Sequence, residues 1–162
     1  MSTNLNSNYQ IRRAGVNELS KVLHHRRSMF LDMGFEGNTV EEAMAISETM
    51  FAEAMHQDRY AGWFVEDASG AVVAGGGIVL IEFQPGPRDP SAYRPWVVNM
   101  YTERDHRGKG LARELMKIMT AWSRQQGFRN LYLHSSKQGR PIYESLGFTP
   151  TNEMGLGLGS SQ

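Results

Sequence analysis

The chain has 162 residues, in which 17 lysines and arginines balance 17 aspartates and glutamates, and it contains no cysteine. This length predicts one domain with a full hydrophobic core. Balanced charge gives no general attraction to nucleic acid or to an anionic membrane, so we expect neither partner. The absence of cysteine excludes disulfides, thiolate metal sites and a cysteine acyl-enzyme, and we expect no bound metal.

The two ends of the chain predict no targeting or membrane segment. Residues 1–8 are polar, and we predict a disordered lead without a signal peptide. No apolar run approaches the ~20 residues that cross a bilayer, so we expect a cytoplasmic protein. Residues 9–158 form the predicted single domain and residues 159–162 a tail. The oligomeric state stays open, with a homodimer as one alternative.

The first third of the chain predicts one strand followed by two helices. Alternation over residues 9–14 predicts the strand, and apolar residues at helical spacing from Val16 to Gly34 predict the first helix. Thr39, followed three residues later by Glu42, predicts a capping box for the second helix. The second helix is expected to bury Val40, Ala43, Met44, Met50 and Phe51, with Met55 as a further candidate.

The middle of the chain predicts three strands. Residues 60–66 and 71–83 flank a turn signal and predict a hairpin. The run Gly75-Gly76-Gly77 marks either a bulge or a close approach to the backbone. A proline-rich loop over residues 84–91 then separates the hairpin from a strand over residues 96–102.

The last third predicts a helix, a strand, a second helix and a last strand. The clearest helix of the chain begins at Leu111 and stops at Gly127. A strand over residues 131–134, a helix over 140–146 and a strand over 154–158 follow. A helix between the fourth and fifth predicted strands implies one parallel pair. The fold class is therefore α+β, with a mixed, mostly antiparallel central sheet and helices on both faces.

A basic turn with two glycines joins the fourth predicted strand to the clearest helix. Backbone N–H groups at such a strand–turn–helix junction point at an anion, and the helix dipole adds to the attraction. A Walker loop needs a glycine where Glu103 stands and a serine or threonine where Gly110 stands, and a dinucleotide fingerprint needs a glycine at Arg113. We therefore predict a phosphate-bearing ligand of another kind.

The pattern Arg107-x-x-Gly110-x-Ala112 resembles the pyrophosphate-binding signature of the GNAT superfamily, the acyl-CoA-dependent N-acetyltransferases. Downstream, Tyr143 and Gly147-Phe148 resemble the last conserved block of this family. The resemblance implies one parallel strand pair that splays apart to bind CoA, and acetyl-CoA as co-substrate. It implies transfer of the acetyl group to a primary amine by direct attack in a ternary complex.

The resemblance also implies site residues. The pyrophosphate would contact Arg107, Gly108, Lys109, Gly110, Leu111 and Ala112, and the rest of CoA would contact Met100, Tyr101, Thr102, Ser136 and Tyr143. The hydroxyl of Tyr143 would face the CoA sulfur and protonate the departing thiolate. We predict a bulge near Asn99–Tyr101 as the cause of the splay.

The group that removes the proton from the amine is not singled out by spacing. An amine with a pKa of ~10 must lose a proton before it attacks. Glu82 is the first candidate and Glu103 the second, with His134 as a further one, while Asn99 is suited to orient a water instead.

Two functions from different classes stay open. The first is an N-acetyltransferase whose acceptor is a small amine, an amino acid, an antibiotic or a protein N-terminus. The second is a CoA-binding sensor or interaction domain without catalysis. Asp32 and Glu36, near the junction of the two N-terminal helices, would supply negative charge that attracts a cationic amine.

Overall fold

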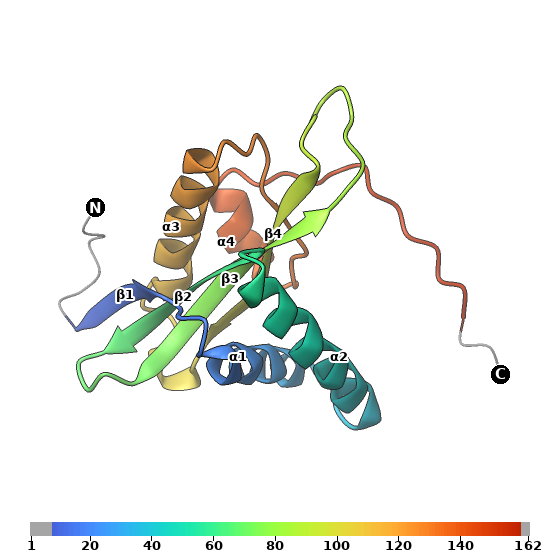
Figure 1. Cartoon of the computed structure of the whole chain (residues 1–162). Helices are drawn as coiled ribbons and strands as arrows, with labels where there is room; N and C mark the ends of the chain where they lie inside the picture. The colour runs from blue at the N-terminus through green and yellow to red at the C-terminus, as the bar shows by residue number, and fades with distance from the viewer. Residues whose placement is uncertain (1–7, 160–162) are drawn as a thin grey trace.

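The computed structural model describes residues 8–159, which form a five-stranded sheet with helices on both faces (Figure 1). The strands are β1 (Tyr9–Arg13), β2 (Tyr60–Asp67), β3 (Val72–Glu82), β4 (Tyr93–Thr102) and β5 (Tyr132–Leu133). The helices are α1 (Leu19–Asp32), α2 (Asn38–His56), α3 (Leu111–Gln125) and α4 (Arg140–Ser145), with a 3-10 turn η1 (Arg104–His106). The strands lie in sequence order; the first four are antiparallel, and β4 and β5 are parallel. The predicted fold class is confirmed.

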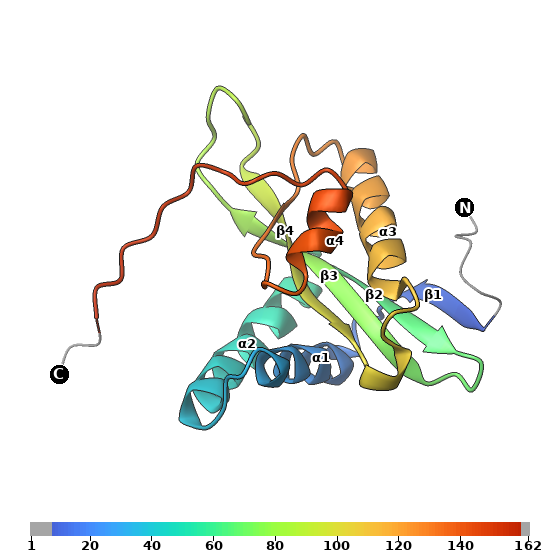
Figure 2. The same cartoon turned by 180° about the vertical axis from the view of Figure 1, so that it is seen from behind.

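The two faces of the sheet carry separate apolar layers. Trp63 and Val65 of β2 pack into the cluster that contains α3, whereas Phe64 between them packs with Val22 of α1 and Phe51 of α2. This alternation is the period-2 pattern of a strand that is buried on both faces. Figure 2 shows the α3 and α4 side of the sheet, and Figure 1 shows α1 and α2 against the other side.

The helix α3 covers one face because its apolar residues recur at helical spacing. Leu111, Leu115, Met116 and Met119 are all buried against the sheet. Full burial of a side chain of this size stabilises the fold by roughly 1.5–3 kcal/mol. The predicted amphipathic helix is confirmed. Burial of Leu111 anchors the first turn of α3 against the sheet.

A bulge interrupts the pairing of β3 with β4. Gly77 pairs with Val98 and Gly75 pairs with Tyr101, so Gly76 faces two residues of β4. One of these, Asn99, has a φ of 58°, which non-glycine residues rarely adopt. The predicted bulge is confirmed, and a side chain at Gly76 would overlap the sulfur of Met100.

The predicted boundaries of the two N-terminal helices were partly wrong. The first helix begins at Leu19 rather than near Val16, which is exposed. The second begins at Asn38 after Gly37, whose φ is 69°, so Thr39 lies inside the first turn. The Thr39 hydroxyl donates to the Glu36 carbonyl, 3.1 Å away, instead of forming a capping box.

Two further predictions were wrong. Met50 of α2 is 42% exposed, because it lies at the border of the buried helix face whose centre is marked by Phe51. The predicted last strand over residues 154–158 does not form, and Met154, Leu156 and Leu158 are 99%, 84% and 89% exposed. The intervening glycines offer no side chain to pack, and Figures 1 and 2 show this segment leading away from the body.

The predicted lead over residues 1–8 falls almost entirely outside the described residues, and so does most of the predicted tail. Between residues 8 and 159, no helix is long and apolar enough to cross a membrane.

Candidate active site

The parallel strands β4 and β5 separate after two residue pairs. Trp96 pairs with Tyr132 and Val97 with Leu133, and no further pair follows. β4 continues to Thr102 while still paired with β3 on its other side. Within residues 8–159, its edge toward β5 therefore has no strand partner beyond Val97. This free edge is where an extended ligand can add main-chain hydrogen bonds as a strand does.

The turn between η1 and α3 exposes backbone donors. Gly108 and Gly110 have φ values of 73° and 80°, and nothing lies within 4 Å of the position of a Cβ on either. In residues 8–159, the N–H groups of Gly108, Lys109 and Gly110 donate to no acceptor. The first N–H groups of α3 add to these, because a helix start has no internal acceptor for them. The turn therefore fits a pyrophosphate.

The guanidinium of Arg107 is held at the edge of this turn. Its Nε donates to the Thr102 carbonyl at 2.9 Å, and its Nη2 pairs with Asp32 at the end of α1. Arg104 pairs with the same carboxylate at 3.3 Å. Asp32 thus forms ion pairs with two arginines, so its negative charge is compensated and does not attract a cationic amine. The sequence had not indicated this ion pair.

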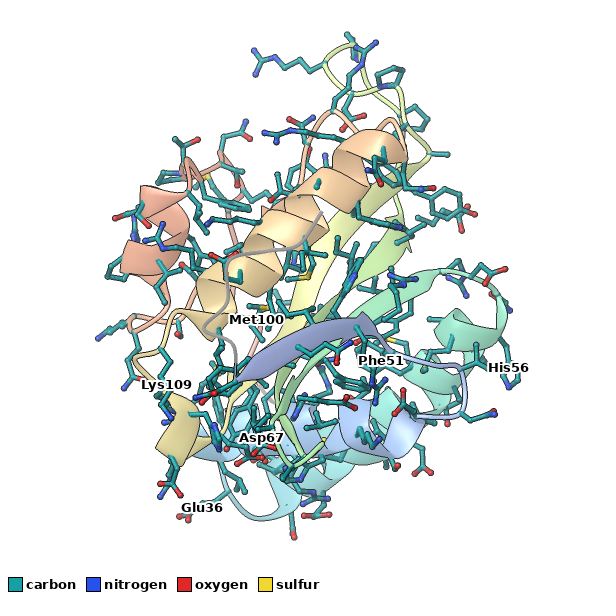
Figure 3. The ribbon with its side chains drawn as sticks, turned by 90° about the vertical axis from the view of Figure 1, so that its left-hand side faces the viewer. Glu36, Phe51, His56, Asp67, Met100 and Lys109 are labelled. Atoms are coloured by element: carbon teal, nitrogen blue, oxygen red, sulfur yellow. The ribbon has the colours of Figure 1, made fainter. Side chains whose placement is uncertain are left out.

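Two other basic side chains of the turn also have protein partners. Lys109 Nζ donates to the Tyr9 hydroxyl of β1 at 3.1 Å, and this hydroxyl lies 2.9 Å from His106 Nδ1. Arg113 donates to Ser145 Oγ of α4 at 2.8 Å. These contacts stabilise the loop from three sides. Figure 3 shows Lys109 in the turn and Met100 on the strand that leads to it.

Tyr143 lies on α4, half-buried against the apolar cluster that contains Val97 and Leu133. Burial raises the pKa of its hydroxyl above the ordinary value, so the phenol stays protonated at neutral pH. A Cβ at Gly139 would lie 3.0 Å from the Tyr143 ring and 3.3 Å from Ser136 Oγ. The absence of a side chain at Gly139 thus allows these two groups to pack together.

Ser136 occupies the turn between β5 and α4. Its hydroxyl oxygen accepts a hydrogen bond from the Gly139 N–H at 3.1 Å. Ser136 thus supports the backbone of the turn that follows β5.

The two candidate carboxylates lie far from the point where β4 and β5 separate. Glu82 is exposed and lies opposite Tyr93, four residues before Val97, or about 13 Å along the strand. Glu103 lies six residues after Val97, or about 20 Å. The structure brings neither of them to the opening.

Glu103 is also engaged by neighbouring side chains. One of its oxygens lies 2.9 Å from His24 Nε2, and the other accepts a hydrogen bond from the Tyr101 hydroxyl at 3.3 Å. It lines an open pocket of about 630 Å³ that also contains Asp32 and Arg104. This pocket lies among α1, η1 and the β2–β3 turn, away from β5.

A polar contact that the sequence did not indicate supports the bulge. Arg26 of α1 donates from Nη1 to Asn99 Oδ1 at 3.0 Å and from Nε to Ser47 Oγ of α2 at 2.7 Å. Among the described residues, Asn99 Nδ2 is buried without a hydrogen-bond partner. Nothing local in the sequence marks Arg26, because its partners are 21 and 73 residues away.

Comparison with known proteins agrees with this geometry. The sequence profile of the Acetyltransferase (GNAT) family matches residues 24–148. The chain belongs to this family, whose members transfer acetyl groups from acetyl-CoA. A search of curated proteins found no match.

Solved structures include similar proteins along nearly the whole chain. A GCN5-related N-acetyltransferase from Ralstonia eutropha JMP134 is 28% identical with a TM-score of 0.86, over 93% of this chain and 98% of that one. A predicted acetyltransferase from Clostridium acetobutylicum, solved with acetyl-CoA, is 25% identical with a TM-score of 0.83, over 93% and 96%. Glucosamine-6-phosphate N-acetyltransferase from Arabidopsis thaliana shares the fold at 16% identity and a TM-score of 0.66, over 94% and 100%.

Proposed function

We propose that the protein transfers the acetyl group of acetyl-CoA to a primary amine by direct attack of the amine in a ternary complex. The observation that carries the proposal is one continuous path: the free edge of β4 beyond Val97 leads to the donor-rich turn at Gly108–Gly110. An extended chain with amides followed by a pyrophosphate matches that path. The absence of cysteine supports direct transfer, since no cysteine can carry the acetyl group.

The backbone of the turn and of the first residues of α3 would hold the pyrophosphate, and the edge of β4 would hold the pantetheine amides. The first group comprises Arg107, Gly108, Lys109, Gly110, Leu111 and Ala112; the second comprises Met100, Tyr101 and Thr102, with Ser136 on the opposite rim. Because three basic side chains near the turn are bound to protein groups, backbone N–H groups would provide most of the phosphate contacts.

Tyr143 is the proposed acid. As the bond between the carbonyl carbon and sulfur breaks, its hydroxyl would donate a proton to the departing sulfur. Burial raises the pKa of this phenol, so the hydroxyl carries its proton at neutral pH but is a weaker acid than an exposed tyrosine. Glu82 and Glu103 would accept the proton of the amine only through water or through a nearer group, because both lie several residues from the opening along β4.

Calorimetric titration with acetyl-CoA, followed by a thiol-release assay over a panel of primary amines, tests this function. We expect saturable binding of acetyl-CoA and CoA release that depends on the amine. Binding without turnover on any amine would favour a sensor, and failure to bind would contradict the assignment of the turn.

A further inference from the structure

His134 is the first residue of the chain past the point where β4 and β5 separate. The last pair of the parallel ladder is Val97 with Leu133, and His134 follows directly. Its side chain is exposed. In the proposed function, this is where the thioester would lie, between the pantetheine edge of β4 and the sulfur-facing phenol of Tyr143.

The ring of His134 lies on a defined face of the sheet. It meets Trp96 edge-on at a centroid distance of 4.8 Å, and Trp96 in turn stacks on Tyr132 at 5.6 Å. Val97 and Leu133, which alternate with these residues, pack into the α3 cluster on the other face. The three rings therefore share the face opposite α3.

Tyr143 approaches from the α3 face, where it packs against the same cluster as Val97 and Leu133. The opening between β4 and β5 is thus flanked by a phenol on one face and an imidazole on the other. Placing the phenol and the imidazole on different faces suits direct transfer. The amine attacks the carbonyl carbon beside the imidazole, while the sulfur departs with its electron pair beside the phenol.

The imidazole of His134 is available. In residues 8–159, the His134 side chain forms no hydrogen bond or ion pair, and its ring contact is with Trp96. Arg94 of β4 lies over the Tyr132 ring at 4.9 Å and is paired with Glu153 at 3.1 Å. The positive charge beside these rings is thus partly compensated by a carboxylate.

We propose that His134 accepts the proton of the attacking amine and that Trp96 positions its ring. This assignment rests on the proposed function. The ammonium group gives one proton to the imidazole and becomes a neutral amine. Its nitrogen then forms a bond to the carbonyl carbon and gives its second proton to water, while the carbon–sulfur bond breaks and the sulfur takes a proton from Tyr143. The imidazolium then releases its proton to water and the phenolate regains one, so the products are the amide and CoA.

The test compares two amines of equal shape and different basicity. Ethylamine is protonated at neutral pH and needs a base, whereas 2,2,2-trifluoroethylamine is largely neutral and loses its proton readily to water. We expect His134→Gln to lower kcat with ethylamine roughly 100-fold, and with trifluoroethylamine less than about 5-fold, since general base catalysis supplies effects of this order. The KM for acetyl-CoA stays the same.

His56→Gln is the matched control, because His56 is an exposed histidine at the last residue of α2 and lies far from Met100 and Lys109 in Figure 3. It should match the wild type with both amines. Equal losses with both amines in His134→Gln, or no loss with ethylamine, would overturn the role of His134 and leave the transfer intact. A wild-type protein that binds acetyl-CoA but releases CoA with neither of these amines nor with any other amine of the panel would instead overturn the proposed transfer itself.

Discussion

The carboxylate of Asp32, the last residue of α1, pairs with the guanidinium of Arg107 in the turn that precedes α3. The same carboxylate also pairs with Arg104. One end of the N-terminal helix layer is thereby joined to the proposed phosphate site. A ligand phosphate near the turn would compete with Asp32 for both arginines.

Asp32→Asn should therefore tighten acetyl-CoA binding, by about 2- to 5-fold, because it removes the competing charge and an exposed pair contributes only ~0.2–1 kcal/mol. Titration calorimetry at two ionic strengths measures the change, and the gain should shrink at higher salt. Weaker binding in a folded Asp32→Asn protein would mean that the ion pair organises the site rather than competing with the ligand.

Gly110→Asp should abolish measurable acetyl-CoA binding, since it places a carboxylate where the pyrophosphate is proposed to lie. Gly110→Asn is the matched control: it has the same shape without charge, and asparagine tolerates the positive φ of 80° at this position better than most residues. Calorimetry should find the asparagine variant weakened but able to bind. Equal affinity in the two variants would show that charge at Gly110 does not matter.

Tyr143→Phe should lower kcat by about 10- to 100-fold while the acetyl-CoA affinity stays nearly unchanged, because only the proton donor is lost. The ring keeps its contact with Phe148, at a centroid distance of 6.0 Å. Since burial raises the pKa of the phenol, the wild type should keep this proton donor at alkaline pH. Intact turnover with weakened binding would assign Tyr143 to CoA binding instead.

His25 should make the fold sensitive to mild acid. This histidine of α1 is 2% exposed, and a Cβ at Gly75 would lie only 2.7 Å from its Nδ1. Burial, with the neighbouring charge of His24, lowers its pKa to about 4. The unfolded chain, with a histidine pKa of about 6.5, binds more protons between these values, so stability falls as the pH falls through this range.

The expected loss is at most about 3 kcal/mol between about pH 7 and about pH 4. Urea unfolding of the wild type and of His25→Gln over this range measures it. The glutamine variant should be less stable at neutral pH but should show a shallower fall, while the exposed His56→Gln control keeps the wild-type slope. Parallel curves for wild type and His25→Gln would contradict a neutral, buried His25.

Local signals in the sequence were sufficient for much of the fold, and the proposed CoA-binding residues remain a prediction. The β2–β3 hairpin and the α3 helix depend on residues close together in the chain, and the parallel β4–β5 pair follows from the helix between its two strands. All three were predicted correctly. The bulge at Asn99 was also predicted. The boundary of α2 was not, because the positive φ of Gly37 starts the helix before Thr39.

The sequence by itself determined the position of the strand–turn–helix junction at which we predict an anion-binding site. The strand, the glycine turn and the amphipathic helix are encoded by neighbouring residues around Gly110. Only the tertiary structure decided which side chains surround the opening, since this depends on strand register across the sheet. Strand register places Glu82 opposite Tyr93, and the ring of His134 meets Trp96 on the face opposite α3. The packing of α4 brings Tyr143 to the α3 face. The tertiary structure also joins Asp32 to Arg107, 75 residues apart, through a contact that no local pattern indicates.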